Sequence, residues 1–256
     1  MLSARVSAPP LLVLFLAVGL SACGGGESAP PAPPAPVAPA AKPVDPATAA
    51  TVTGRITFSG QAPAPRPISM ASDPRCINPG AVTETVVTGA DGGLQNVFVY
   101  VKDGLGDASF PVPATPVVLD QKGCQYRPHV FGVQVGQPIE ILNSDATLHN
   151  IHALPMANQG FNVGQALQGL RHTHTFSTKE VMVPFKCDVH RWMNAYVGVL
   201  DHPFHAVTKA DGSFTLNGLP PGTYTVEAWH ESLGTMTQSV TVGAKETKEV
   251  AFSFAG

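Results

Sequence analysis

The segment VPFKCDVHRWMNAYVG, residues 183–198, carries three side chains that can bind a metal. His190 follows Cys187 by three residues, and Met193 follows His190 by three. A thiolate and a thioether favour Cu(I), whereas imidazole also suits Cu(II), so this donor set predicts copper. Zinc is the rival metal, but a structural zinc site normally uses four Cys or His ligands. The alternative is that all three residues pack in a core without a metal.

A metal site on this segment needs at least one further ligand from elsewhere in the chain. The candidate is His149, in VGQPIEILNSDATLHNIH, residues 135–152. An early His-Asn pair followed by Cys-x-x-His-x-x-Met resembles the cupredoxin family of blue-copper proteins, and the short late spacing is similar to that of amicyanin. Upstream, YRPHVFGVQVG, residues 126–136, resembles the family's early strands. The resemblance covers residues 116–200.

The resemblance implies a Greek-key sandwich with one type 1 copper ion that passes single electrons and has no open position for a substrate. By the same resemblance, Asn150 connects the two segments that carry the ligands. His190 is the ligand nearest the surface in cupredoxins, so electrons would pass there, beside Arg191 and Trp192. The partner would be a redox protein such as a cytochrome c or a periplasmic dehydrogenase. The implied ligands are His149, Cys187, His190 and Met193.

The other histidines carry weaker signals. His152 follows His149 by three positions, and on a strand this spacing turns the two rings to opposite faces, so they should not share a metal. His172 and His174 share a face if their segment is extended. They form either a second, weaker copper or zinc site or a solvated polar face. Two others, His129 and His230, lie in strand-like segments and are interpreted as hydrogen-bonded structural residues.

The N-terminal residues indicate export. An apolar run, residues 11–20, is too short for a permanent transmembrane helix but suits a signal peptide, predicted over residues 1–22. The run ends in Leu20-Ser21-Ala22-Cys23, which resembles a bacterial lipobox and implies that Cys23 is the lipid anchor. An ordinary signal peptide is the alternative. Residues 23–50 are a Gly/Pro/Ala-rich linker, which favours an extended spacer between the membrane and the folded part. The expected location is the periplasm, the outer membrane or the cell surface.

The chain has four cysteines, and an exported protein meets an oxidising compartment. If Cys23 carries lipid and Cys187 binds metal, Cys76 and Cys124 remain. They either form a disulfide or stay as two buried thiols, because sequence alone does not establish a pairing.

The sequence of the folded part predicts an all-β structure. Apolar and polar residues alternate in TVTGRITFSG, residues 51–60, in HVFGVQVGQ, residues 129–137, and near the C-terminus. The segment NVFVYVKD, residues 96–103, is typical of a strand that is covered on both faces. Asp-Gly and Pro-Gly pairs separate such runs, which indicates a sandwich or barrel. Residues 155–170 are less regular and are interpreted as a loop with a short helical turn.

A second resemblance concerns residues 206–229, AVTKADGSFTLNGLPPGTYTVEAW. The segment resembles the carboxypeptidase regulatory-like, or prealbumin-like, β-sandwich. Members of this family begin with two strands that directly precede such a segment. Here the matching strands lie about a hundred residues upstream, so the sandwich is interpreted as split. Its first half would be residues 51–111, the copper domain residues 112–203, and its second half residues 204–256. Two sandwiches in series, the first incomplete, are the alternative.

Composition and motifs exclude several classes of function. The net charge is −3 and no run of Lys or Arg occurs, which argues against nucleic acid as a partner. No Gly-x-Ser-x-Gly elbow or phosphate-binding glycine loop is present, so an enzyme is not expected. Two alternatives to electron transfer stay open. The protein could bind and deliver copper with the same ligands, or it could be a surface sandwich without a metal.

Overall fold

The structure is a computed structural model and describes residues 44–76 and 78–256. The predicted signal peptide, the lipid anchor Cys23 and the linker up to residue 43 lie outside the described residues. Among the described residues, no helix has the length and apolar character needed to cross a membrane.

The described part of the chain is built from strands, which confirms the all-β prediction. Its one short helical element is a 3-10 turn, η1 (Pro74–Cys76). The expectation of a helical turn within residues 155–170 was wrong, because β8 (Phe161–Gln165) is a strand. It pairs antiparallel with β7 (His149–Ala153), and its alternating burial shows that one of its faces packs inward. The polar residues and the glycine of this strand obscure the pattern in the sequence.

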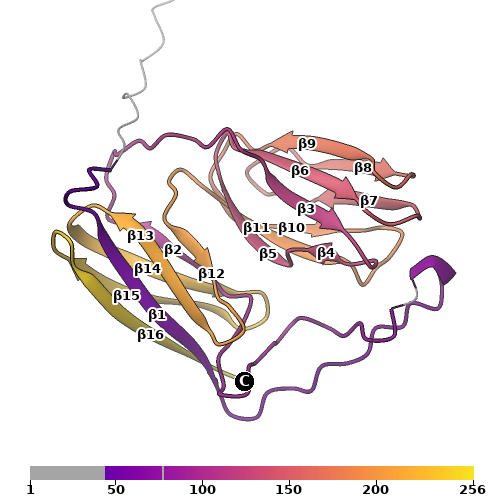
Figure 1. Cartoon of the computed structure of the whole chain (residues 1–256), viewed down its shortest axis with the longest axis horizontal. Coiled ribbons are helices and arrows are strands. Elements are labelled where there is room, and N and C mark those ends of the chain that lie inside the picture. The colour runs from indigo at the N-terminus through magenta and orange to yellow at the C-terminus, as the bar shows by residue number, and fades with distance from the viewer. Residues whose placement is uncertain (1–43, 77) are drawn as a thin grey trace, which may run out of the picture. The chain divides into compact units, whose positions relative to one another are not determined.

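Two of the sheets combine strands from both ends of the described chain. Their strand orders are β13-β1-β16 and β12-β2-β14-β15 (Figure 1). All four apolar residues at the start of β2 are buried, as the sequence predicts for a strand covered on both faces. The strands of these two sheets are β1 (Ala50–Ser59), β2 (Phe98–Asp103), β12 (His205–Val207), β13 (Ser213–Leu219), β14 (Gly222–His230), β15 (Gly234–Val242) and β16 (Thr247–Ala255).

The other two sheets use only strands from residues 117–200. Their orders are β5-β11-β10-β7-β8 and β4-β3-β6-β9. A separate apolar core fills this pair of sheets, and it contains Cys187 and Met193. Besides β7 and β8, the strands are β3 (Val117–Gln121), β4 (Tyr126–Arg127), β5 (Val130–Gln134), β6 (Pro138–Asn143), β9 (Arg171–Thr175), β10 (Glu180–Lys186) and β11 (Asn194–Leu200). We call this part of the chain the inserted sandwich, because β1 and β2 precede it while their partner strands follow it.

The two pairs of sheets meet at a small apolar cluster. Phe98 of β2 packs there with Val130 of β5 and Leu200 of β11. Two glycines on neighbouring strands of the inserted sandwich permit this approach. A Cβ at Gly132 would come within 2.8 Å of the Phe98 ring, and one at Gly198 would overlap the same ring. Both glycines are therefore required by packing.

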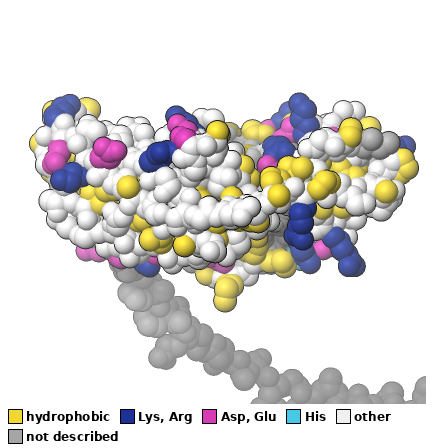
Figure 2. All heavy atoms as spheres, turned by 90° about the horizontal axis from the view of Figure 1, so that it is seen from below, with side chains coloured by type: hydrophobic (Ala, Val, Ile, Leu, Met, Phe, Trp, Pro, Cys, Tyr) yellow, Lys and Arg dark blue, Asp and Glu magenta, His cyan; other side chains and the backbone are white. Residues whose placement is uncertain are grey.

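Charged side chains are mixed on the surface. On the face that Figure 2 shows, the Lys and Arg side chains of the described residues stand in small groups with Asp and Glu nearby. No continuous basic stripe is visible on that face.

Candidate metal centre

The predicted ligands come from two segments of the inserted sandwich. His149 opens β7, whereas Cys187 and His190 lie in the connection from β10 to β11. That connection is closed by backbone hydrogen bonds. The N–H of Met193 donates to the carbonyl of His190 at 2.9 Å, and the N–H of Cys187 donates to the carbonyl of Met193 at 3.1 Å. This tight loop keeps the three potential ligands of the segment close together in space.

The structure brings His149, Cys187 and His190 together. The Nδ1 atoms of the two histidines lie 2.9 Å apart, and Cys187 Sγ lies 3.9 Å from His190 Nδ1. All three ligand atoms lie within 4.8 Å of one another. Each residue is at most 2% exposed. Two imidazole nitrogens and a thiol that converge in an apolar interior fit the donor chemistry of a copper ion.

Met193 is also buried, at 1% exposed, and belongs to the same core cluster as Cys187. Its backbone closes the loop, as described above. Its role as the fourth ligand stays a prediction.

The charges around the three donors favour a thiolate. Burial lowers the pKa of His149, but hydrogen bonds to Asp145 and Cys187 outweigh it and raise that pKa to about 9. Burial raises the pKa of Cys187, yet the His149 imidazole and nearby backbone N–H groups lower it overall. The pKa of His190 is lowered, mainly by burial. These surroundings therefore favour the thiolate over the thiol, and the thiolate is the form that binds metals.

Asn150 connects the two ligand segments, as the cupredoxin resemblance implies. Its Oδ1 accepts the N–H of Asp188 at 2.7 Å and lies 3.2 Å from Cys187 Sγ. Its Nδ2 donates to Asn162 at 2.7 Å and to the Asp188 carboxylate at 3.1 Å. Sequence reasoning missed Asp188 and Asn162, because Asp188 stands at a variable position of the Cys-x-x-His-x-x-Met motif and Asn162 lies outside the motif.

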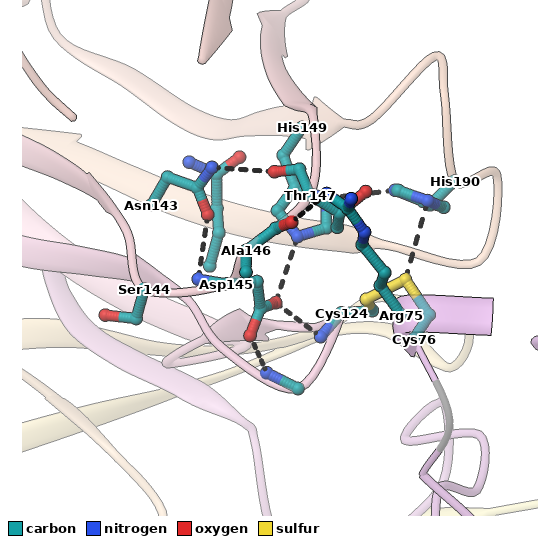
Figure 3. A network of polar contacts seen from close by, with 12 residues as sticks. Arg75, Cys76, Cys124, Asn143, Ser144, Asp145, Ala146, Thr147, His149 and His190 are labelled. Carbon is teal, nitrogen blue, oxygen red and sulfur yellow. Dashed lines mark hydrogen bonds and ion pairs between the residues drawn. A yellow bond between two sulfur atoms is a disulfide. The ribbon is translucent and has the colours of Figure 1, made fainter. Parts of the chain in front are cut away.

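A carboxylate lies beside the Nε2 atom of each histidine, opposite the converging Nδ1 atoms. Figure 3 shows the one from Asp145 next to His149. The Nε2 of His149 is 2.9 Å from Asp145 Oδ2, and the Nε2 of His190 is 3.1 Å from Asp73 Oδ2. Asp73 accepts further bonds from the Thr147 hydroxyl at 2.7 Å and the Arg75 N–H at 2.9 Å. These bonds lower the pKa of Asp73 to about 2. Nothing in the sequence connects Asp73 with the motif 117 residues later.

The expectation that His190 is the ligand nearest the surface was wrong, because His190 is only 1% exposed. Asp73 and Cys76 cover its ring edge, with Cys76 Sγ 3.5 Å from Nε2. Trp192 packs against it from another side, at 5.1 Å between ring centres. Of the two neighbours expected to shape a docking patch, Arg191 is exposed but Trp192 is half-buried and donates its ring N–H to the Cys124 carbonyl.

The structure joins Cys76 to Cys124 in a disulfide, so it shows the first of the two alternatives that the sequence left open. Cys187 is the free cysteine among the described residues and is buried. Within the described ranges, two other groups of potential metal ligands lie around this site, and both contain a cysteine of the disulfide. Those groups, Asp73-Cys76-His190 and Cys124-Asp145-His149, use the Nε2 side of each ring and a sulfur that is already bonded.

The other histidines have different surroundings. The ring of His152 is partly exposed and bonds Asp188 at 2.9 Å. His174 packs against Phe161, at 4.0 Å between ring centres, and His172 lies near the same ring. The groups of potential metal ligands found in the described part of the chain include neither of these two histidines. His129 bonds the Asn194 carbonyl and Glu231. His230 accepts the Ser232 N–H, so both are hydrogen-bonded structural residues, as interpreted from sequence.

Comparison with protein families agrees with one of the two resemblances. A family model of the carboxypeptidase regulatory-like domain matches residues 193–255. That segment resembles this domain. The search of curated protein sequences gives no match.

Among solved structures, the chain is similar to a copper-containing nitrite reductase from Thermus scotoductus, at 20% identity and a TM-score of 0.33. The match covers 37% of this chain and only 24% of the reductase. A purple cupredoxin from Nitrosopumilus maritimus is 21% identical, with a TM-score of 0.29, and the match covers 32% of this chain and 98% of the cupredoxin. A mutant of amicyanin is 21% identical, with a TM-score of 0.30, over 34% of this chain and 85% of amicyanin.

Proposed function

We propose that the protein is a type 1 copper protein that transfers single electrons between redox partners. The observation that carries the proposal is the convergence of His149 Nδ1, His190 Nδ1 and Cys187 Sγ in a buried pocket. Met193 would supply the fourth ligand. A bound copper ion supplies one-electron chemistry by alternating between Cu(II) and Cu(I). The residues of the chain supply the rest, namely a fixed donor set, a thiolate and the exclusion of water.

Burial supports electron transfer over copper delivery. All four proposed ligands are at most 2% exposed, and both imidazoles are fixed on their far side by carboxylates. A delivery protein needs a ligand that a recipient can reach, whereas an electron carrier gains from ligands that do not move when the oxidation state changes. The same rigid and closed pocket leaves no position for a substrate, which supports a carrier without catalytic activity.

The proposed partner is a redox protein such as a cytochrome c or a periplasmic dehydrogenase. Because the ring of His190 is covered, the partner would approach over neighbouring apolar side chains. Leu148 and Val189 are 44% and 47% exposed, and each precedes a histidine ligand. They offer an apolar contact surface one residue away from His149 and His190.

We further propose that the protein is exported and lipid-anchored through Cys23. The disulfide between Cys76 and Cys124 supports export, because such bonds persist in oxidising compartments.

The experiment that tests the function is to load the purified protein with Cu(II) and record its visible and EPR spectra. A type 1 centre gives an intense blue thiolate-to-copper band and a narrow copper hyperfine splitting. Reduction and reoxidation should remove and restore the band without loss of copper. A protein that stays colourless and retains no copper would contradict the proposal and favour a surface sandwich without a metal.

A further inference from the structure

The connection between β1 and β2 joins two strands that lie outside the inserted sandwich. Its tip nevertheless contacts the candidate metal centre. Several independent contacts hold the tip there. Cys76 is bonded to Cys124, Arg75 Nη1 donates to the Ala146 carbonyl at 2.6 Å, and Thr147 donates to Asp73 at 2.7 Å. Figure 3 shows Arg75, Ala146, Thr147 and the disulfide in the neighbourhood of His149 and His190. The tip, residues 73–76, is therefore fixed to the inserted sandwich beside His190.

The two histidines have matching surroundings. Each turns Nδ1 toward the other donors and Nε2 toward a carboxylate, at 2.9 Å for Asp145 and 3.1 Å for Asp73. A carboxylate that accepts the second N–H of a metal-binding imidazole fixes the tautomer and the ring orientation. Asp145 lies four residues from its histidine. Asp73 comes from outside the inserted sandwich, so this sandwich alone supplies only one of the two carboxylates.

We propose that Asp73 is a positioning residue that completes the copper centre: its carboxylate holds His190 Nδ1 toward the metal and stabilises Cu(II) relative to Cu(I). The inference rests on the proposed function. Its physical basis is that a negative charge behind an imidazole increases the donor strength of the opposite nitrogen and favours the more positive ion. His190 is buried and the Asp73 side chain is 20% exposed, so solvent screens this charge only in part.

Two substitutions separate charge from position. Asp73→Asn keeps an acceptor oxygen for His190 Nε2 but removes the charge. Asp73→Ala removes both. The control is Asp107→Asn, which removes the same charge from an exposed loop outside the cluster. All three proteins are loaded with copper and compared with the wild type by potentiometric titration, EPR and the rate of Cu(I) release to a chelator.

Asp73→Asn should shift the Cu(II)/Cu(I) equilibrium about tenfold toward Cu(I), as expected for one nearby charge at an effective dielectric constant of about 20. For one electron this equals about 59 mV toward a higher potential. Asp73→Ala should add faster Cu(I) release, by about tenfold or more, because His190 is no longer held. Asp107→Asn should change neither quantity. A potential in Asp73→Asn equal to that of the wild type would overturn the inference.

A second readout needs no copper. In the metal-free wild-type protein, the Nε2 proton of His190 should exchange slowly with solvent and be visible by NMR. In Asp73→Ala its exchange should accelerate by about tenfold or more, and an unchanged rate would contradict the hydrogen bond on which the inference stands. The two proposals fail in different ways. A wild-type protein that never turns blue overturns the proposed function, whereas a blue protein that is insensitive to Asp73 overturns only the role of Asp73.

Discussion

The Oδ1 atom of Asn150 accepts the backbone N–H of Asp188 at 2.7 Å, and this bond joins the strand of His149 to the loop of Cys187 and His190. Strand pairing alone connects these segments weakly, because β10 and β7 are paired only at Phe185 and Lys186. Asn150 is 7% exposed, so water cannot easily replace the hydrogen bonds of its side chain. It therefore fixes the distance between the two ligand segments.

Asn150→Ala should destabilise the protein by about 2–3 kcal/mol and broaden the distribution of copper environments. The substitution leaves the Asp188 N–H without its acceptor, whereas the Asp188 carboxylate keeps its bonds to His152 and Asn162. Chemical denaturation measures the first effect and EPR linewidth the second. Asn217→Ala, at an exposed position of β13, is the matched control and should change neither. Equal stability of Asn150→Ala and wild type would show that the bonds through Asn150 are dispensable.

Cys187→Ser should abolish the blue absorption and keep the fold. Serine is nearly isosteric but its hydroxyl stays protonated, so it cannot supply the thiolate responsible for the band. The visible spectrum of the copper-loaded variant tests the first part, and circular dichroism with thermal unfolding tests the second. A variant that is still blue would show that Cys187 is not a ligand.

Met193→Leu should keep copper and raise the reduction potential, because the axial ligand tunes the potential and leucine does not bind the metal. The change conserves volume in a tightly packed core, so its cost in stability should stay below about 1.5 kcal/mol. Met156→Leu is the control, since Met156 is 98% exposed. If protein-film voltammetry gave the same potential for Met193→Leu as for wild type, Met193 would not be the axial ligand.

Replacing both Cys76 and Cys124 by serine should lower the free energy of unfolding by about 4 kcal/mol, from the loop-closure entropy of a crosslink between residues 48 apart. It should also loosen residues 73–76 and so raise the reduction potential in the same direction as Asp73→Asn. Denaturant titrations with and without a thiol reductant test the first effect. The reductant should destabilise the wild type and leave the double variant unchanged. If the reductant destabilised both proteins to the same extent, its effect would not come from the Cys76–Cys124 disulfide.

The sequence predicted the parts of the site that lie within short motifs, and it missed the parts that only folding brings together. The convergence of His149, Cys187 and His190 could be predicted, because all three lie in short motifs at the ends of strands of one sandwich. Asp73 could not be predicted, because its contact with His190 depends on a long connection that starts in the other pair of sheets and carries no strand. The burial of His190 was missed for the same reason: the residues that cover it belong to that connection.

Sequence patterns predicted β1, β2 and β16 well, since β1 and β16 place apolar residues at every second position and β2 begins with four apolar residues. The same method failed for β8. Its sequence FNVGQ buries a glutamine, which bonds to Gln121 and to backbone carbonyls instead of facing water. A buried polar residue on an edge strand reverses the usual relation between polarity and exposure, so alternation alone could not find it.

Acid should destabilise the protein through His202, which lies where the inserted sandwich ends. Its Nε2 donates to the Val101 carbonyl at 2.8 Å and its Nδ1 accepts the Phe204 N–H at 3.2 Å, an arrangement that only the neutral ring can make. Burial lowers the pKa of His202 to about 4. Between pH 6.5 and 4 the unfolded chain therefore binds a proton that the folded chain refuses, so this histidine's contribution to stability is lost as the pH falls below 6.5.

From pH 7 to pH 5 this effect costs about 2 kcal/mol, at about 1.4 kcal/mol for each pH unit below 6.5. His202→Gln keeps a donor for Val101 but cannot be protonated, so it should lose about 2 kcal/mol less than wild type over the same range. Urea titrations of the metal-free proteins at the two pH values measure the difference. The metal-free form is used because copper binding is itself pH-dependent, and the contributions of His149 and His205 cancel between the two proteins. Equal losses in both proteins would show that His202 is protonated in the folded state at pH 5 without cost.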